Sequence, residues 1–304
     1  MKKSIISIAA LLFFMQCHAC PFCGCGVGGF YIGLLPTYKS TFFGVRYETM
    51  SYATHVKADA TQFSYDHYTV AELWGGVSVG KKWQLLAFMP YHINLQNTDD
   101  GAKHQNGIGD ATVIANYRLW QTSKVNFKTK SLLKQELWLG AGVKLPTGKY
   151  NVDLSNPDTE LGDVNSQMGT GSLDFIVNGT YKITINSIGI NTTAAYKINT
   201  VNNSNFRYGN RFNANSFAFY STAVKKLGLA PNIGVLYEDA AINRLQKGAV
   251  EETGGYVALA AAGIEVNIKK LTIGGNVQAP FSQNFAQGQT TAKMRGMLHI
   301  SVSL

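Results

Sequence analysis

The chain has 304 residues, of which 31 are glycine, and a formal charge of +9. Only 15% of its residues are charged, and 12% are aromatic. Soluble domains carry about 25% charged residues, so this composition argues against an ordinary cytosolic domain. It favours a membrane β-barrel, whose outer face is apolar and rich in aromatic side chains. A secreted β-sandwich is the soluble alternative.

The N-terminus has the features of a secretory signal peptide, residues 1–19. Lys2 and Lys3 precede an apolar run at 5–15 that is followed by small residues, so cleavage is expected after Ala19. The run is shorter than the roughly 20 residues of a transmembrane helix. Loss of the two lysines lowers the charge from +9 to +7. Export argues against nucleic acid as the partner of this basic chain.

All four cysteines lie between Cys17 and Cys25. Cleavage would leave Cys20 at the mature N-terminus, followed by Cys23 and Cys25. These three thiols form a candidate metal site, and copper or zinc is the only cofactor that the sequence suggests, because soft thiolates suit Cu(I) and Zn(II). A disulfide in an oxidising compartment and a lipid on Cys20 are the alternatives, and the sequence leaves them open.

The segment 20–38 contains the cysteines and an apolar, Gly-rich stretch. It is predicted either to plug the barrel or to lie against the periplasmic mouth. The barrel itself is expected to span residues 39–304, which contain no cysteine. A closed barrel needs no disulfides, because its strands pair in a complete ring.

The main evidence for a barrel is an alternation of apolar and polar side chains over runs of ten or more residues. In one run Val113, Tyr117 and Leu119 share a face. Asn116 and Arg118 share the opposite face. Successive side chains of a strand point to opposite faces, and a tilted strand needs about 9–11 residues to cross a bilayer. Strands of a β-sandwich are usually shorter, about 5–6 residues.

About twelve such runs predict an all-β fold, a closed, transmembrane, antiparallel up-and-down barrel. They lie near residues 39–52, 67–79, 83–95, 109–120, 133–145, 170–185, 188–199, 209–224, 229–238, 254–268, 271–281 and 293–304. Short connections alternate with long ones, as turns and outer loops do in bacterial barrels, so both chain ends are expected on the periplasmic side. The link at 121–132 is expected to be longer than the other short connections.

Charged and amide side chains of these runs are expected to face the lumen, because a cation on the lipid face costs about 2–4 kcal/mol near the bilayer centre. The candidate lumen-lining residues are Arg46, Glu48, Glu72, Asp110, Asn116, Arg118, Lys134, Glu136, Lys144, Asp174, Asn178, Lys182, Lys197, Arg295 and His299. They either pair across strands and stiffen the wall or line a solute path.

The chain ends inside an amphipathic strand, in which Leu298 opposes Arg295 and His299. Such an ending resembles the C-terminal signal of outer-membrane proteins and implies their assembly machinery as a partner. That signal more often ends in Phe, whereas this chain ends in Leu304.

His92 and Asn94 share one face of a predicted strand, an arrangement that a membrane-bound hydrolase could use. A histidine within a strand is more often a wall residue. The sequence contains no paired serine motif, so the chain is predicted not to be an enzyme.

Three stretches, taken in order, resemble one outer-membrane family. Residues 107–120 open a strand with Gly-x-Gly-Asp, residues 140–150 end the next with Leu-Pro-Thr-Gly, and residues 168–181 open the following one with Gly-x-Gly-Ser-x-Asp. Together they resemble the family named for the MetA pathway of phenol degradation, related in architecture to FadL-like transporters. The resemblance covers the middle third of the chain and implies a monomeric barrel that passes small solutes, hydrophobic ones among them. Taken singly, Gly-x-Gly and Pro-Thr-Gly are expected to be structural features of strand ends.

The predicted function is therefore an outer-membrane channel or transporter for small solutes, embedded in outer-membrane lipid. A metal-handling or metal-sensing protein that uses Cys20, Cys23 and Cys25 is the alternative. A structural barrel that docks a periplasmic partner through its thiol tail is a third. Solute flux that survives removal of residues 20–26 would support the first, and tight metal binding by the tail would support the second.

Overall fold

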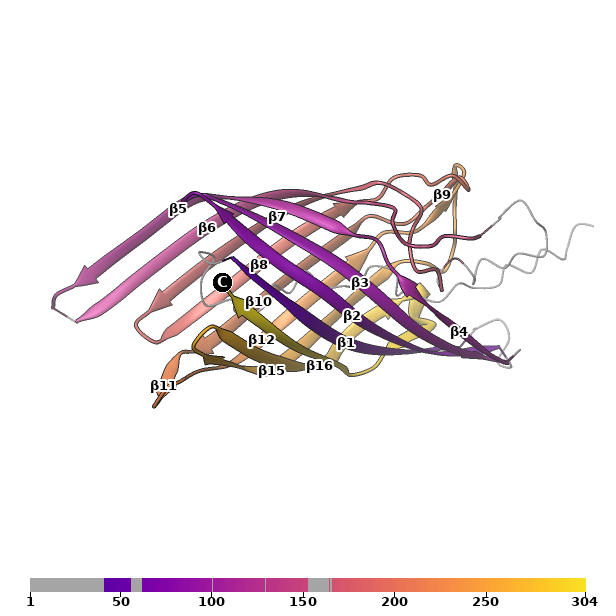
Figure 1. Cartoon of the computed structure of the whole chain (residues 1–304). Helices are drawn as coiled ribbons and strands as arrows, with labels where there is room; N and C mark the ends of the chain where they lie inside the picture. Colours follow the sequence, from indigo (N-terminus) through magenta and orange to yellow (C-terminus); the bar gives the residue numbers. More distant parts are fainter. Residues whose placement is uncertain (1–40, 56–61, 100, 129, 153–163, 165) are drawn as a thin grey trace, which may run out of the picture.

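The computed structural model describes residues 41–55, 62–99, 101–128, 130–152, 164 and 166–304. They form an all-β, antiparallel up-and-down barrel (Figure 1), which confirms the predicted fold class. None of the described residues belongs to a helix long and apolar enough to cross a membrane. The predicted signal peptide, residues 1–19, and the cysteine-containing segment, residues 20–38, lie outside the described residues.

Twelve positions around the barrel are filled by strands that pair in chain order. The strands are β1 (Phe42–His55), β2 (Phe63–Val79), β3 (Trp83–Thr98), β4 (Gly101–Ile108), β5 (Thr112–Asn126), β6 (Ser131–Lys144), β7 (Asp174–Ile185), β8 (Ile188–Ile198), β10 (Arg211–Tyr220), β11 (Thr222–Val224), β12 (Leu227–Ala240), β15 (Gly255–Ile268), β16 (Leu271–Phe285), β17 (Thr290–Ala292) and β18 (Arg295–Ser303). Three positions hold two pieces each: β4 with β5, β10 with β11, and β17 with β18. Pairing of β1 with β18 closes the ring.

Each predicted run contains a strand, and the largest difference lies at residues 121–132. There β5 continues to Asn126 and β6 begins at Ser131, so the predicted long link is wrong and a β-hairpin with a tight turn takes its place. In Figure 1 this hairpin extends well beyond the barrel wall. A bulge between Arg118 and Trp120 shifts the register by one residue, which hides the strand from a strict two-residue pattern.

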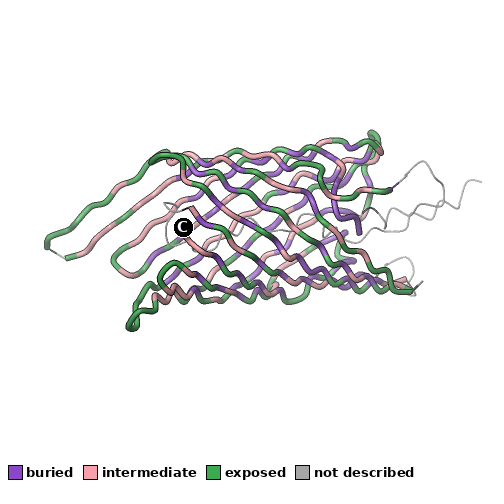
Figure 2. The backbone as a smooth tube through the Cα atoms, viewed as in Figure 1, coloured by how far each residue is buried: buried purple, intermediate pink, exposed green. Residues whose placement is uncertain are grey.

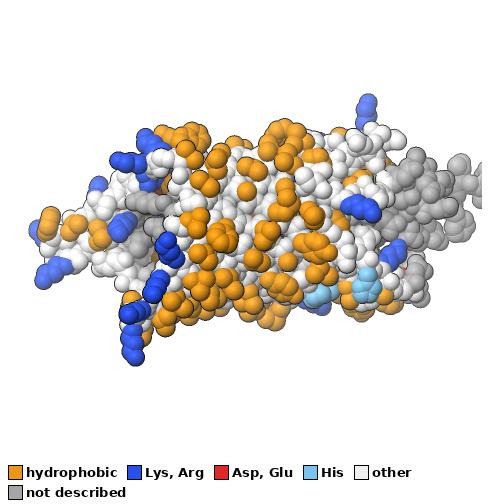
Figure 3. All heavy atoms as spheres, in the orientation of Figure 1, with side chains coloured by type: hydrophobic (Ala, Val, Ile, Leu, Met, Phe, Trp, Pro, Cys, Tyr) orange, Lys and Arg blue, Asp and Glu red, His pale blue; other side chains and the backbone are white. Residues whose placement is uncertain are grey.

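Side chains alternate between the two faces of the wall, as β1 illustrates. Phe43 and Val45 are 58% and 50% exposed, whereas Arg46 and Glu48 are buried. A buried side chain in a one-layer barrel points inward, so the apolar residues face outward and the ionic ones face the lumen. Figure 2 shows buried and exposed residues alternating along the strands, and Figure 3 shows the apolar belt that results.

The two ends of the barrel differ. The turn end carries the C-terminus and the tight connections at 80–82, 127–130, 186–187, 225–226 and 269–270. These connections contain no Asp or Glu, and all but 186–187 contain lysine. Figure 3 shows Lys and Arg side chains gathered beside the apolar belt at this end. The opposite end, the loop end, carries the longer connections.

At the loop end, the connections after β6, β8 and β12 pack together. Those after β8 and β12 form a small sheet from β9 (Phe206–Arg207), β13 (Arg244–Leu245) and β14 (Gly248–Ala249). The apolar core of these connections consists of Val152, Val164, Phe206, Tyr208 and Val250. This packing fixes the described parts of the three connections against one another.

Candidate functional site

The three stretches that resemble the family converge at the loop end of the lumen. Asp110 lies just before β5, Lys144 is the last residue of β6, and Asp174 is the first residue of β7. The antiparallel register places Lys144 beside Asp174, and all three ionic side chains are at most 8% exposed. Together with Thr170 and Ser172 they form a buried polar group that we call the motif cluster.

Asp110 accepts most of the hydrogen bonds in the motif cluster. Its Oδ2 accepts from Lys144 Nζ at 2.5 Å, from the Thr170 backbone N–H at 2.8 Å and from Thr170 Oγ1 at 3.0 Å. Its Oδ1 accepts from the Gly148 N–H at 2.9 Å. A buried carboxylate is costly unless it is paired and hydrogen-bonded. These four bonds therefore hold two loop segments to the start of β5.

Lys144 joins Asp110 to the second carboxylate. Its ammonium lies 3.0 Å from Asp174 Oδ2 and donates to the Ser172 carbonyl at 3.2 Å. Asp174 also accepts from Ser172 Oγ at 2.8 Å and from the Thr200 N–H at 2.9 Å. Loss of the lysine would remove the cation that contacts both buried carboxylates, and breaking such a pair costs about 3–5 kcal/mol.

The Leu-Pro-Thr-Gly turn ties the loop to the preceding strand. Thr147 Oγ1 donates to the Gly109 carbonyl at 3.0 Å and accepts from the Ala111 N–H at 2.8 Å. Gly148 lies against Gly169, and a Cβ on Gly148 would come within 2.8 Å of the Gly169 Cα. Glycine is needed because the two loop segments approach so closely.

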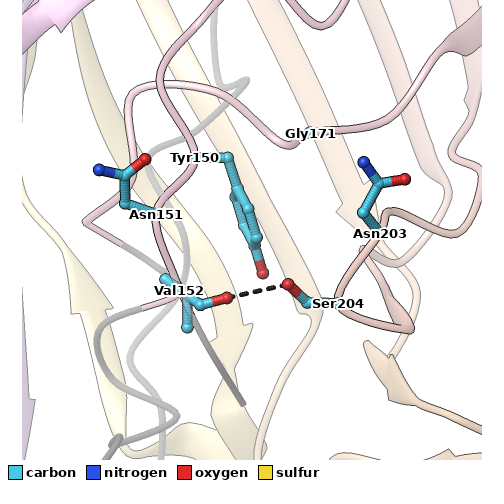
Figure 4. Close-up of a pocket in the computed structure, with 6 residues that line it drawn as sticks. All are labelled: Tyr150, Asn151, Val152, Gly171, Asn203 and Ser204. Carbon is cyan, nitrogen blue, oxygen red and sulfur yellow. Dashed lines mark hydrogen bonds between the residues drawn. The ribbon is translucent and has the colours of Figure 1, made fainter. Parts of the chain in front are cut away.

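A pocket of about 310 Å³ opens beside the motif cluster. Its lining residues are Tyr150, Asn151, Val152, Gly171, Asn203 and Ser204. Figure 4 shows the Tyr150 ring standing between the two connections, next to the bond that Ser204 Oγ donates to the Val152 carbonyl at 2.8 Å. A Cβ on Gly171 would lie 3.2 Å from the Tyr150 ring. All of these groups are uncharged.

One side of the lumen is lined by apolar side chains that contact one another. This apolar half consists of Met50, Tyr52, Tyr68, Val70, Phe217, Phe219, Leu236, Ala240, Val257, Leu259, Ala261, Phe285, Ala292 and Met297. The residues come from neighbouring positions around the barrel, from β2 through the β1–β18 closure to β10. A Cβ on Gly234 would lie 2.5 Å from the Phe217 ring, so glycine there makes room for the ring.

The remaining wall, β3 to β8, presents mainly amides and hydroxyls. Its buried inward residues include Asn116, Asn178, Thr180, Asn191 and Thr193. Asn178 Nδ2 donates to Asn116 Oδ1 at 3.0 Å across β6, and a Cβ on Gly140 of β6 would collide with both amides. A smaller apolar cluster reaches from β1 to β7 and consists of Phe42, Trp74, Leu86, Phe88, Ile114 and Ile176.

Several of the predicted lumen charges form close pairs. Arg46 pairs with Glu72 on the adjacent strand. Arg295 Nη1 lies 2.7 Å from Glu238 Oε1, and Arg295 Nη2 donates to the Tyr52 hydroxyl at 3.1 Å. Because β15 and β16 separate β12 from β18, the Arg295–Glu238 pair links strands that are not neighbours.

His299 and Glu265 form a similar pair across β16, with Nε2 and Oε1 2.9 Å apart. Gly274 of β16 lies between them, and a Cβ there would collide with both side chains. The Trp74 ring meets the His299 ring edge-on at 5.8 Å. Glycines on the central strand thus let flanking side chains meet.

The other predicted lumen residues lie at different depths. The buried ones are Glu48, Asn116, Asn178 and Lys197. The partly buried ones are Arg118, Glu136 and Lys182, and Lys134 is exposed near the protruding hairpin. The Arg118 guanidinium lies 5.5 Å from the Trp138 ring, and the Lys182 ammonium lies 5.4 Å from the Phe219 ring.

Sequence reasoning missed three of the pairing partners, Tyr52, Glu238 and Glu265. The alternation in β12 could have found Glu238, because it shares a face with Leu236 and opposes Tyr237. It also missed Thr170 and Ser172 of the motif cluster. They lie in a loop that folds back on the strands, and no local pattern indicates that fold.

His92 and Asn94 both lie buried on the inward face of β3. His92 packs against Gly109, where a Cβ would lie 2.6 Å from the ring Cδ2. Within the described residues no group of three or more His, Cys, Asp and Glu could hold a metal ion. The candidate metal ligands Cys20, Cys23 and Cys25 lie outside those residues.

Several buried polar atoms of the lumen have no hydrogen-bond partner within the described part of the protein. They include amide atoms of Gln84, Asn94, Asn191, Asn232 and Gln278. An orphaned polar group in a dry interior costs about 1–3 kcal/mol. The lumen therefore offers donors and acceptors to water or to a polar solute.

The sequence matches the family described as "Putative MetA-pathway of phenol degradation" over residues 47–292. No curated protein matches it. An outer membrane channel from Pseudomonas putida F1 has a similar fold, with a TM-score of 0.58 and 12% identity over 88% of this chain and 97% of that chain. The transport unit of the autotransporter AIDA-I from Escherichia coli is less similar, with a TM-score of 0.48 and 12% identity over 90% of this chain and 94% of that one. Because the family match covers most of the chain, the protein belongs to the family of the putative MetA pathway of phenol degradation, as its three motifs predicted, and it has the fold of an outer-membrane barrel.

Proposed function

We propose that this protein is an outer-membrane channel that passes small solutes with an apolar part. The observation that carries the proposal is the composition of the lumen, in which an apolar half adjoins a wall of amides, several of which have polar atoms without a partner among the described residues. A solute that has both kinds of surface can contact both walls at once.

A barrel interior that served only as a packed core fits these residues poorly. Gln84 is 0% exposed, and neither of its amide atoms has a protein partner in the described part of the chain. At about 1–3 kcal/mol for each orphaned group, several such residues would consume much of the 5–15 kcal/mol that stabilises a typical domain. Water or polar solutes in a lumen satisfy these atoms at little cost.

The ion pairs support passage of small solutes. Arg46–Glu72 and Arg295–Glu238 pair opposite charges on the strands that close the barrel, and His299 contacts Glu265. The Arg295–Glu238 pair links non-adjacent strands, so it occupies space that a wide pore would leave open. A narrow lumen with paired charges favours small molecules over large or highly charged ones.

The barrel is proposed to lie in the outer membrane as a monomer, with its turn end toward the periplasm and its loops outside, as in bacterial barrels. The amphipathic strand β18 would be the segment that the assembly machinery reads. A channel needs no catalytic residue, and we assign the buried His92 to the wall.

The proposal can be tested by recording from the full mature chain in planar bilayers. We expect discrete ohmic currents that benzamide, an uncharged aromatic amide, interrupts reversibly and that arabinose, a sugar of comparable size, does not. In a Leu236→Asn variant the interruptions should become about threefold rarer at the same conductance, because burial of one aliphatic side chain is worth about 1.5–3 kcal/mol and the solute covers only part of it. Equal effects of benzamide and arabinose would contradict the role of the apolar half.

A further inference from the structure

Four buried polar residues lie close together on the inner face of the last four strand positions. They are Asn232 of β12, Asn276 and Gln278 of β16, and Arg295 of β18, and each is at most 5% exposed. In the strand register, Gln278 is the direct partner of Arg295. Asn232 and Asn276 are both partners of Gly263 on β15, one from each side. The register therefore gathers the four side chains at one place in the lumen wall.

Each of these residues has one polar atom without a hydrogen-bond partner in the described part of the chain. Two of the atoms are acceptors, Asn232 Oδ1 and Gln278 Oε1, and two are donors, Asn276 Nδ2 and Arg295 Nε. The amides are held by their other ends. Gln278 Nε2 donates to Asn276 Oδ1 at 2.9 Å, and Asn232 Nδ2 donates to the Ala230 carbonyl at 3.2 Å. These bonds determine which atom of each amide stays available to a further group.

Small residues of β15 lie between the four side chains. Ala261 is the register partner of Gln278, next to Gly263 with its two amide partners. A Cβ on Gly263 would lie 2.7 Å from the Asn276 Cβ and 3.1 Å from Asn232 Oδ1, so a larger residue would crowd both amides. Ala261 also belongs to the apolar half. An apolar surface therefore adjoins the available donors and acceptors.

The positive charge of Arg295 is balanced by the acids around it. Arg295 Nη1 lies 2.7 Å from Glu238 Oε1, and Nη2 donates to the Tyr52 hydroxyl at 3.1 Å. Glu48 is a further acid of this region, because it is the register partner of Met297, which follows Arg295 on the same face of β18. This balance favours an uncharged polar group over an anion as the partner of the Arg295 Nε–H.

We propose that Asn232, Asn276, Gln278 and Arg295 form a binding site for the primary carboxamide group of a small solute with an apolar body. A carboxamide carries a carbonyl acceptor and two N–H donors on one planar group. Its carbonyl accepts from the two available donors, its NH2 donates to the two available acceptors, and its body lies against the apolar half. This inference rests on the proposed channel function and deepens it, since it names the polar group that the lumen recognises.

The test compares benzamide with acetophenone as blockers of the single-channel current of the full mature chain. Acetophenone has nearly the same shape and the same carbonyl acceptor, but a methyl group replaces the NH2. In the wild-type protein, half-block should require about tenfold less benzamide than acetophenone, because the methyl group leaves two buried acceptors unpaired. Gln278→Met should lower this preference to about threefold or less, because one of the two acceptors is gone.

Gln96→Met is the matched control, since it makes the same substitution on the inner face of β3. Gln96 is also buried, but its Nε2 donates to Ser64 Oγ at 3.3 Å, and it lies on a strand away from the site. This variant should keep the wild-type preference within about twofold. Equal losses in Gln96→Met and Gln278→Met would overturn the site in favour of a general polarity of the lumen.

The wild-type protein alone already separates the two proposals. Absence of any current would contradict the channel function itself. Current that acetophenone blocks at the same concentration as benzamide, or at a lower one, would leave the channel standing and contradict the carboxamide site, because water alone would then satisfy the four atoms. This outcome decides between the proposals even if the Gln278 variant fails to assemble.

Discussion

The motif cluster and the middle of the lumen are both buried and polar, yet they differ in how their polar groups are satisfied. In the motif cluster, Asp110 accepts four hydrogen bonds, and Lys144 contacts both carboxylates. Farther along the lumen, Gln84 and Asn232 have polar atoms without partners in the described part of the chain. The comparison indicates that the first region is a structural lock for the loops, whereas the second is a surface that water and solutes complete.

The largest effect is expected when the cation of the motif cluster is removed. Lys144→Met should lower the free energy of unfolding by about 3–5 kcal/mol, because it leaves two buried carboxylates unpaired. Lys182→Met, which removes a lysine with no ion pair in the described structure, should lower it by less than about 1 kcal/mol. Chemical unfolding of both variants in lipid vesicles measures the difference. Equal losses would show that the motif cluster does not stabilise the protein more than another inward lysine does.

The pair that links β12 to β18 allows a second comparison. Glu238→Gln and Arg295→Gln should each lower the free energy of unfolding by about 2–4 kcal/mol, since each leaves a buried charge alone. The double variant should be more stable than the sum of the two losses predicts. A double-mutant cycle measures this coupling, and strict additivity would show that the two charges act independently.

The Thr147 hydroxyl supplies a smaller effect within the loop anchor. Thr147→Val should cost about 1–2 kcal/mol, because the Gly109 carbonyl and the Ala111 N–H both lose a partner. Thr112→Val is a matched control on the same wall, as no side-chain hydrogen bond of Thr112 is present among the described residues. Limited proteolysis of the loop should accelerate only in the first variant; acceleration in both would point to a general loss of packing.

The smallest expected change lies in the lumen. Gln84→Leu should alter the free energy of unfolding by less than about 1 kcal/mol, because the replaced amide has no protein partner to leave behind. Chemical unfolding of the variant in lipid vesicles measures this change. A loss of more than about 2 kcal/mol would mean that the Gln84 amide makes stabilising contacts with other protein groups.

Much of the fold could be predicted from the sequence, because each barrel strand shows its alternation of apolar and polar residues within its own sequence. The two-residue alternation in β1, β5 and β18 separates the lipid face from the lumen without knowledge of the partner strands. The pattern failed at residues 121–132, where a bulge at Leu119 shifts the alternation and the strands continue past the barrel wall.

The candidate site was harder to predict, because it depends on contacts between distant segments. The three motifs could be recognised, but their meeting at Asp110 requires the register of β5, β6 and β7 and a loop that folds back on them. The meeting of the amides beside Arg295 likewise follows from a register that single-strand patterns do not reveal. Glu265 lies two strands away from its partner His299, across the small residue Gly274.

The motif cluster is described as a structural anchor and the lumen wall as a solute path. The most direct test of this difference is the reactivity of single cysteines toward a water-soluble thiol reagent in intact vesicles. Cysteine would be placed at Asn232 in the lumen or at Thr170 in the motif cluster, in a chain with Cys20, Cys23 and Cys25 changed to serine. The account predicts that Asn232→Cys reacts at least about tenfold faster than Thr170→Cys, because water reaches the lumen wall and the motif cluster excludes it. Equal protection of both positions would contradict the account and show that the barrel interior is a packed core.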